Sequence, residues 1–213
     1  MTKPPDSPPR EKTKKGFSRR DLIKGAGLAG GALSTGVLET PAEAAAAGNS
    51  VGPAAVPITL KINGKAVNLT VEPRTTLLDA FRNQIGLTGV KRVCDRGTCG
   101  ACTDIINGKA VYSCTTLAID AQGRDIQTIE GFAPEGKMHP VSEAFVHNDG
   151  QQCGYCTPGF VVAAKNFLDR NPNPTYEQVE RGLGGNLCRC GTYVGVRKAV
   201  LEAAKNMKGG SRG

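Results

Sequence analysis

The chain has 213 residues, which allows one large domain or two small ones. Its hydrophobic fraction is 39%, and no apolar run reaches the ~18–20 residues of a membrane-spanning helix, so we expect no stable membrane insertion. The formal charge of +8 is spread along the chain without a basic block that carries aromatic residues, so we expect no nucleic-acid binding. Eight cysteines with only 5% aromatic residues favour a chain held together by metal or disulfides rather than by a large core.

The first 50 residues are predicted to be a signal peptide and a linker. A basic, proline-rich start is followed by Arg19-Arg20, then by an uncharged Gly- and Ala-rich run over 25–38, and then by an A-x-A pattern at 42–44. These three features in this order are typical of a signal peptide. The arginine pair resembles the signal of the twin-arginine export machinery. We therefore expect a periplasmic protein that is exported already folded.

Residues 56–132 are expected to form a small α+β domain. Apolar residues alternate on either side of Asn63-Gly64, and this dipeptide favours the tight turn of an antiparallel hairpin. Thr75 or Thr76 would cap a helix with an apolar stripe. The predicted elements are a hairpin over 56–71, a helix over 77–85, a second hairpin over 103–114 and a strand over about 125–129.

Residues 138–208 are expected to form an all-α domain. Apolar residues recur at helical spacing, as at Val161, Ala164 and Leu168. A Gly- and Pro-containing stretch at 130–140 joins the two halves. The predicted helices cover 139–148, 158–170, 176–183 and 193–207.

The first half contains four of the eight cysteines, in a pattern with a known chemistry. Three of them follow the spacing C-x4-C-x2-C, which is that of plant-type [2Fe–2S] proteins. We expect Gly97 and Gly100 to supply the backbone angles that let a short loop wrap closely around a cluster. Backbone amides of the loop would point at the sulfurs. The predicted ligands are Cys94, Cys99, Cys102 and Cys114.

The second half contains the other four cysteines, as the pairs Cys153-x2-Cys156 and Cys188-x-Cys190. Each pair lies in the turn before a predicted helix. The dipole and the free amides of a helix N-terminus favour anionic thiolates. Two such turns that meet across a helical domain would enclose a second site with four thiolates.

Three alternatives compete with iron–sulfur clusters. Zinc binds four thiolates, but its common spacing is a pair of C-x2–4-C motifs, which differs from both groups. Disulfides suit an exported protein, yet Cys188 and Cys190 are too close together to act as independent cross-links. Cys153 and Cys156 alone would fit a thioredoxin-like redox pair, but the flanking β–α pattern is missing.

Three segments in order resemble a known family. They are GLTGVKRVCDRGTCGACT at 86–103, QCGYCTPGF at 152–160 and GNLCRC at 185–190. Together they resemble the iron–sulfur subunits of the xanthine dehydrogenase/aldehyde oxidase family of molybdenum hydroxylases, over about Ile58 to Ala204. With the twin-arginine leader, the sequence resembles the iron–sulfur subunit of a bacterial periplasmic aldehyde oxidoreductase.

The resemblance implies a fold and a set of cofactors. The fold would be a plant-ferredoxin-like β-grasp domain followed by a four-helix domain, with one [2Fe–2S] cluster in each. Electrons would leave a molybdopterin, of the cytosine dinucleotide form, in a catalytic partner subunit. They would pass through the cluster of the helical domain and then that of the ferredoxin-like domain to FAD in another partner. Gln152 would hydrogen-bond the pterin, and Cys190 would lie at its edge, where electrons enter.

The resemblance therefore predicts an electron-transfer subunit of a heterotrimeric oxidoreductase that oxidises aldehydes to acids, with no substrate chemistry on this chain. Two positions depart from the family pattern: Val93 replaces a glycine, and Gly191-Thr192 replaces Thr-Gly. Neither departure removes a ligand. Two alternatives stay open, namely a free-standing two-cluster electron carrier and the iron–sulfur subunit of a purine or heterocycle hydroxylase.

Overall fold

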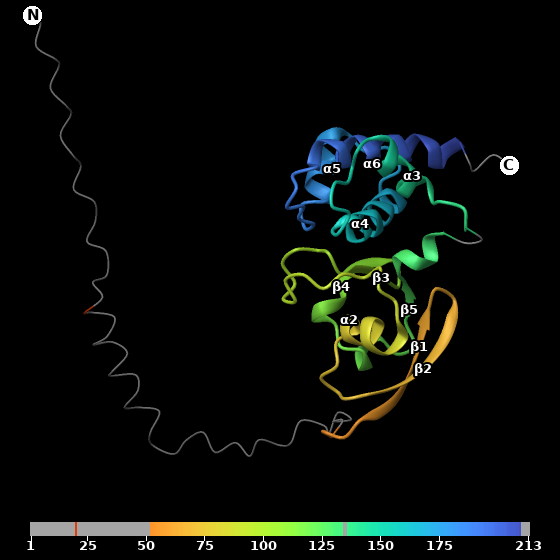
Figure 1. Ribbon diagram of the computed structural model, residues 1–213, viewed down its shortest axis with the longest axis vertical. Helices are drawn as coiled ribbons and strands as arrows, with labels where there is room; N and C mark the ends of the chain where they lie inside the picture. The colour runs from red at the N-terminus through yellow and green to blue at the C-terminus, as the bar shows by residue number, and fades with distance from the viewer. Residues whose placement is uncertain (1–19, 21–51, 134–135, 210–213) are drawn as a thin grey trace, which may run out of the picture. The chain divides into compact units, whose positions relative to one another are not determined.

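The structure is a computed structural model that describes Arg20 and residues 52–133 and 136–209 (Figure 1). The predicted signal peptide and linker, 1–50, lie outside the described residues except for Arg20. Residues 51–213 make up one compact unit. Within the described part of the chain, no helix has both the length and the apolar character needed to cross a membrane.

The first hairpin is formed by β1 (Val56–Ile62) and β2 (Lys65–Val71), which pair antiparallel from Val56↔Val71 to Ile62↔Lys65. Asn63 and Gly64 have φ values of 49° and 79°. Both values are positive, as a type I′ turn requires, and Asn-Gly is the dipeptide that adopts them most readily. The predicted hairpin and its turn are confirmed.

A five-stranded mixed sheet has the order β2-β1-β5-β3-β4. A second antiparallel hairpin consists of β3 (Thr103–Ile106) and β4 (Lys109–Tyr112), and β5 (Asp125–Gln127) lies between the two hairpins. β5 runs parallel to β1 and antiparallel to β3. The sequence predicted these strands, but their order in the sheet follows from long-range pairing. Three short 3-10 turns follow β4 and flank β5: Ser113–Thr115, Ile119–Ala121 and Ile129–Phe132.

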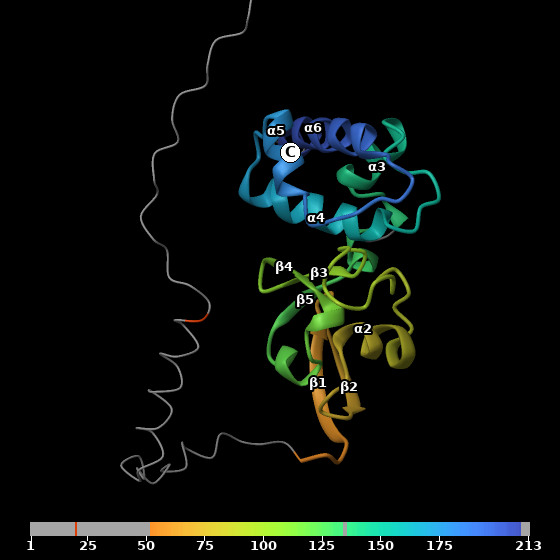
Figure 2. The ribbon, with the colours of Figure 1, turned by 90° about the vertical axis from the view of Figure 1, so that its left-hand side faces the viewer.

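One helical segment packs beside this sheet (Figure 2). It begins as α2 (Leu77–Asp79), where the Thr76 hydroxyl accepts a hydrogen bond from the Asp79 amide. This is the preferred chemistry of a helix N-cap. The segment continues as the π-helical turn Ala80–Ile85 instead of the single α-helix expected, and ends at Gly86 with φ 80°. The apolar stripe is buried as predicted.

The second half is helical, as predicted. Its core is made of buried apolar side chains such as Phe145, Val162 and Val200. Thr175 and Gln178 form a capping box, in which each side chain accepts a hydrogen bond from the other residue's backbone amide. The helices are α3 (Pro140–His147), α4 (Thr157–Arg170), α5 (Tyr176–Gly182) and α6 (Tyr193–Gly209).

Helix α4 packs against the β3–β4 hairpin and connects the two halves (Figure 1). Ile105 of β3 belongs to the core of the helical half. Asn166 of α4 is buried; its Oδ1 accepts from the Ala110 amide at 3.2 Å, and its Nδ2 donates to the Gly108 carbonyl at 2.7 Å. One amide side chain thus pairs with the edge strand of the sheet, which would otherwise present unpaired backbone groups.

Candidate metal centres

The loop between the π-helical turn and β3 carries the first three cysteines. Gly97 and Gly100 have φ values of 70° and 69°, which confirms the predicted need for glycine at both positions. Asp95 also has a positive φ, of 55°, which the sequence analysis missed. The Gly97 amide donates to Cys114 Sγ at 3.2 Å, and the Thr98 amide donates to Cys94 Sγ at 3.4 Å.

The first four cysteines lie as two pairs. Cys94 interacts with Cys99, and Cys102 interacts with Cys114. Burial raises the pKa of the Cys94 thiol, but amide donors, led by Arg96, outweigh burial and lower that pKa to about 6. Burial and the neighbouring Cys114 raise the pKa of Cys102 to about 12. The first pair is half-buried and rich in amide donors, whereas the second pair is buried.

The second four cysteines meet at the start of α4 and before α6. Cys156, at the N-cap of α4, interacts with Cys188, and burial with this contact raises the pKa of Cys156 to about 12. For Cys188, burial raises the pKa, but hydrogen bonds led by Thr192 lower it to about 7. The Thr192 hydroxyl lies 3.2 Å from Cys188 Sγ. Cys153 and Cys190 are both exposed, so this group has an inner and an outer side.

The thiols lie in pairs in both groups. All eight cysteines are free thiols. Among the described residues, no three or more His, Cys, Asp or Glu side chains converge on a position for one metal ion. A [2Fe–2S] cluster spreads its four ligands over two irons, two to each, and thiolates grouped in pairs with amide donors fit this requirement.

The two cysteine loops touch each other through the segment 185–187. The Leu187 amide donates to the Cys99 carbonyl at 2.9 Å. The Asn186 Nδ2 donates to the Gly100 carbonyl at 2.8 Å and to Thr103 Oγ1 at 3.2 Å. Cys188, a predicted ligand, follows directly. The motif GNLCRC predicts its cysteines but not these contacts, because only the packing of the two halves creates them.

Gln152 and Cys190, the residues predicted to meet a pterin, are both exposed. Large apolar side chains stand exposed close to them in the sequence. Those side chains are Tyr155, Leu187 and Val194, which are 49%, 49% and 57% exposed. Val93, beside Cys94, is 56% exposed and has no positive φ, so this departure from the family pattern leaves an ordinary backbone.

Asp104 is a second residue that the sequence analysis missed. It lies in β3, two residues after the predicted ligand Cys102, and is fully buried. Burial raises the pKa of its carboxyl well above the usual range. Burial thus disfavours the charged form of this carboxyl group.

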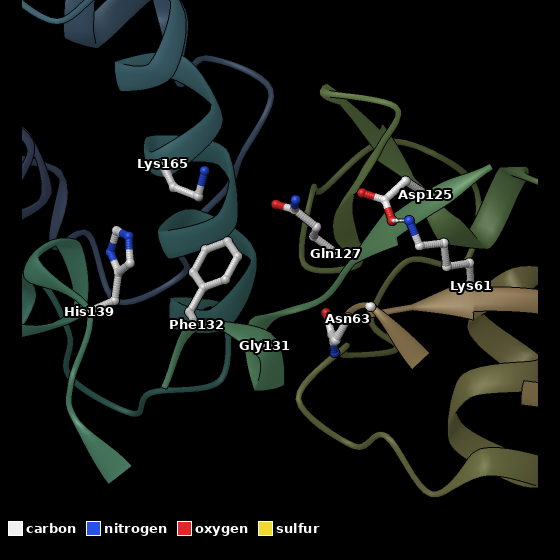
Figure 3. Close-up of a pocket in the computed structure, with 9 residues that line it drawn as sticks. Lys61, Asn63, Asp125, Gln127, Gly131, Phe132, His139 and Lys165 are labelled. Carbon is white, nitrogen blue, oxygen red and sulfur yellow. Dashed lines mark ion pairs between the residues drawn. The ribbon is translucent and has the colours of Figure 1, made fainter. Parts of the chain in front are cut away.

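A separate pocket of about 500 Å³ contains no cysteine (Figure 3). Its basic side chains already have acidic partners: Lys61 pairs with Asp125 at 3.1 Å, and Lys165 pairs with Asp169 at 2.6 Å. His139 Nδ1 accepts from the Val141 amide, so this histidine caps α3, as expected of a histidine near a helix end. None of the predicted cluster ligands lines this pocket, and its lysines are paired with acidic residues.

Comparison with known families assigns both halves to cluster-binding domains. Residues 60–127 match the family described as a 2Fe-2S iron-sulfur cluster binding domain. Residues 128–201 match the family described as a [2Fe-2S] binding domain. These matches agree with the mixed sheet of the first half and the helices of the second.

Individual relatives extend this result. The aldehyde oxidoreductase iron-sulfur-binding subunit PaoA of Escherichia coli K12 is 38% identical over 209 residues, which cover 90% of each chain. A crystal structure of quinoline 2-oxidoreductase from Pseudomonas putida 86 matches with a TM-score of 0.66 at 40% identity, over 71% of this chain and 97% of that one. The aldehyde oxidoreductase of Desulfovibrio desulfuricans matches with a TM-score of 0.69 at 40% identity, over 72% of this chain and 17% of that longer one.

Proposed function

The chain belongs to the iron–sulfur subunit family of the molybdenum hydroxylases, and we propose that it is the electron-transfer subunit of a periplasmic aldehyde oxidoreductase. The reaction served would be the oxidation of aldehydes to carboxylic acids. When bound, a [2Fe–2S] cluster supplies reversible one-electron transfer. In this proposal electrons pass from a molybdopterin in the catalytic subunit, through the helical half and then the ferredoxin-like half, to FAD in a third subunit.

The contact between the two cysteine loops is the observation that carries the proposal. A carrier with one cluster needs only the first four cysteines. This chain adds helices α3 to α6, proposed here as the four-helix domain, and a second group of four cysteines. The hydrogen bond from the Leu187 amide to the Cys99 carbonyl then joins one ligand loop to the other in a single folded unit.

The roles of the residues follow from their surroundings. Cys94, Cys99, Cys102 and Cys114 would hold one cluster, and Cys153, Cys156, Cys188 and Cys190 the other. Hydrogen bonds lower the pKa values of Cys94 and Cys188, to about 6 and about 7, and so favour in each group the thiolate form that binds metal. The exposed outer side of the second group would face the catalytic subunit. Gln152 would there hydrogen-bond the pterin, proposed to be the cytosine dinucleotide form.

Metal analysis with electron paramagnetic resonance (EPR) of the dithionite-reduced protein tests the two-cluster assignment. We expect about four irons per chain and two distinct [2Fe–2S] signals. Cys114→Ser should remove one signal and Cys188→Ser the other, so each variant is the control for its counterpart. Zinc in place of iron, or one signal lost equally in both variants, would contradict the assignment.

The co-expressed complex tests the direction of electron flow. Cys153→Ser should stop steady-state turnover with an external acceptor, while the substrate should still reduce the molybdenum centre in a single turnover. Full turnover by this variant would contradict the relay. A chain that purifies alone from its native source, without larger subunits, would favour a free-standing electron carrier instead.

A second candidate substrate class is supported by one comparison. The quinoline 2-oxidoreductase matches at 40% identity over 97% of its matched chain, the same identity as the aldehyde oxidoreductase of Desulfovibrio desulfuricans. The substrate pocket would lie in the catalytic subunit in either case. Assays of the complex with aldehydes and with N-heterocycles distinguish the two candidates, and we expect turnover with aldehydes.

Export through the twin-arginine route is part of the same proposal. It is supported by the arginine pair before a weakly apolar run. Replacing both arginines, as Arg19→Lys with Arg20→Lys, should leave the protein in the cytoplasmic fraction. Lys24→Arg, which keeps the charge and leaves the pair intact, is the matched control. Equal export of both variants would contradict this route.

A further inference from the structure

Two buried asparagines connect the halves of the molecule, at different places. Asn166 pairs with the edge of β4, at Gly108 and Ala110. Asn186 reaches the cysteine loop itself, at the Gly100 carbonyl and Thr103 Oγ1. Both side chains are almost fully buried, with 1% and 6% exposure, so each loses water on folding and gains hydrogen bonds across the halves.

The surroundings of Asn186 leave little freedom for its amide. Thr103 Oγ1 donates to the Gly100 carbonyl at 2.6 Å, so the two acceptors of Asn186 are themselves held together. A Cβ atom on Gly100 would lie 2.6 Å from Asn186 Nδ2 and from the Gly185 carbonyl. The two loops therefore approach closely only because position 100 lacks a side chain and the Asn186 amide fills the remaining space.

The position of Asn186 along the chain links it to both cysteine groups. Gly100 lies between the ligands Cys99 and Cys102. The next residue after Asn186 is Leu187, whose amide donates to the Cys99 carbonyl, and the ligand Cys188 follows. An amide that fixes residue 186 against residue 100 therefore also fixes the hydrogen bond that joins the two ligand loops.

We propose that Asn186 is a positioning residue that holds the two ligand loops at a fixed separation and thereby sets the electronic coupling between the two clusters. This inference rests on the proposed function. The rate of electron transfer and the magnetic interaction between two centres both fall steeply with separation. Loss of the Asn186 hydrogen bonds should therefore weaken both without removing any ligand.

The test compares Asn186→Ala with Asn166→Ala in the full chain with both clusters bound. Each variant deletes one buried amide and two hydrogen bonds between the halves, so both should lower the melting temperature. Only Asn186→Ala should diminish the intercluster splitting in the EPR spectrum of the fully reduced protein. Intercluster electron transfer after pulsed one-electron reduction should slow several-fold in that variant, while each cluster keeps its own g values.

Thr103→Val provides a milder variant if Asn186→Ala does not fold. It keeps the shape of the side chain and removes one of the two acceptors of Asn186, so a partial loss of splitting is expected. The inference would be overturned if Asn186→Ala showed the wild-type intercluster splitting and the wild-type rate of intercluster electron transfer. The same holds for Thr103→Val if that variant replaces Asn186→Ala. Equal losses in Asn166→Ala would also overturn it. A wild-type protein without two cluster signals would instead refute the proposed function.

Discussion

The Tyr112 hydroxyl donates a hydrogen bond of 2.8 Å to the Gly185 carbonyl, and it is also the atom that a side chain at position 185 would strike first. The next nearest atom to a Cβ at Gly185 is Tyr112 Cζ, at 3.6 Å, which is an ordinary contact. One oxygen atom thus both stabilises the loop before Cys188 and restricts position 185 to glycine.

A double-mutant cycle should reveal this relationship. Tyr112→Phe should cost about 1 kcal/mol, the usual net value of a hydrogen bond. Gly185→Ala should cost a similar amount, because the tyrosine must move away and lose the same bond. The double variant should be no less stable than Tyr112→Phe alone, and thermal unfolding of the four proteins checks this. If the losses of stability in the two single variants add up in the double variant, the alanine methyl group at position 185 must clash with an atom other than the Tyr112 hydroxyl.

Gly159 in α4 should be essential for the contact between the helix and the first cysteine loop. Alanine normally stabilises a helix interior relative to glycine. Here the added Cβ would collide with the Gly100 carbonyl and lie 3.0 Å from Ala101 Cα, and backbone atoms cannot rotate away. We expect Gly159→Ala to destabilise the protein by about 1–3 kcal/mol in thermal or denaturant unfolding. Gly52→Ala, whose Cβ meets nothing within 4 Å, is the control.

The backbone around the first cluster site should tolerate glycine at position 93 and reject valine at position 97. Val93 is exposed and has no positive φ, so Val93→Gly should cost no more than about 1 kcal/mol through chain entropy and should keep the first cluster's visible absorption. Gly97 has φ 70°, and its Cβ would lie 3.0 Å from Thr115. Gly97→Val should therefore lose the first cluster. Retention of that cluster by Gly97→Val would contradict this account.

His139 should make the stability of the protein depend on pH. Burial, and then the nearby Lys165, lower the pKa of His139 in the folded protein below its unfolded value of about 6.5. Between these two pKa values the unfolded chain binds more protons than the folded protein. The contribution of His139 to the free energy of unfolding is therefore fully present above about pH 6.5. It is lost as the pH falls through the pKa of His139 in the folded protein. Protonation of Nδ1 would also remove the acceptor for the Val141 amide.

Two substitutions separate the titration of His139 from its role as a helix cap. His139→Asn keeps a side chain that can cap α3 and should reduce the loss of stability between pH 7 and pH 5. His139→Ala should reduce the pH dependence of the free energy of unfolding in the same way. At pH 8, however, this variant should be less stable by about 1 kcal/mol, because the helix cap is lost. Denaturant unfolding across this pH range gives both quantities. An unchanged slope in both variants would show that other groups are responsible.

Local chemistry explains which parts of the structure could be predicted from the sequence. Asn63-Gly64 and Asn107-Gly108 specify their turns through the backbone angles these residues accept, and both are present. Helices α3 to α6 begin and end within two residues of the predicted positions, because their caps and apolar stripes are local signals. The π-helical turn at Ala80–Ile85 and the parallel pairing of β1 with β5 depend on distant neighbours.

The candidate site shows the same division. Cysteine spacing identified the two groups and the need for Gly97 and Gly100, since these are requirements of one short loop. The inner and outer sides of the second group and the burial of Asp104 depend on tertiary packing, and the hydrogen bonds of Asn186 arise where one half packs on the other. No spacing rule records such contacts. The assignment of the eight cysteines as cluster ligands stays a prediction for the metal analysis.

The hydrogen bonds of Asn166 to the β4 edge limit how this chain could be rebuilt. A ferredoxin-like half cut away from α4 would expose the Ala110 amide, the Gly108 carbonyl and the side chain of Ile105, which now lies in the helical core. Such an edge invites pairing with other chains. Exchanging one half for a domain with a different reduction potential would therefore require a new partner for this edge, so the modular appearance of the sequence overstates the independence of its parts.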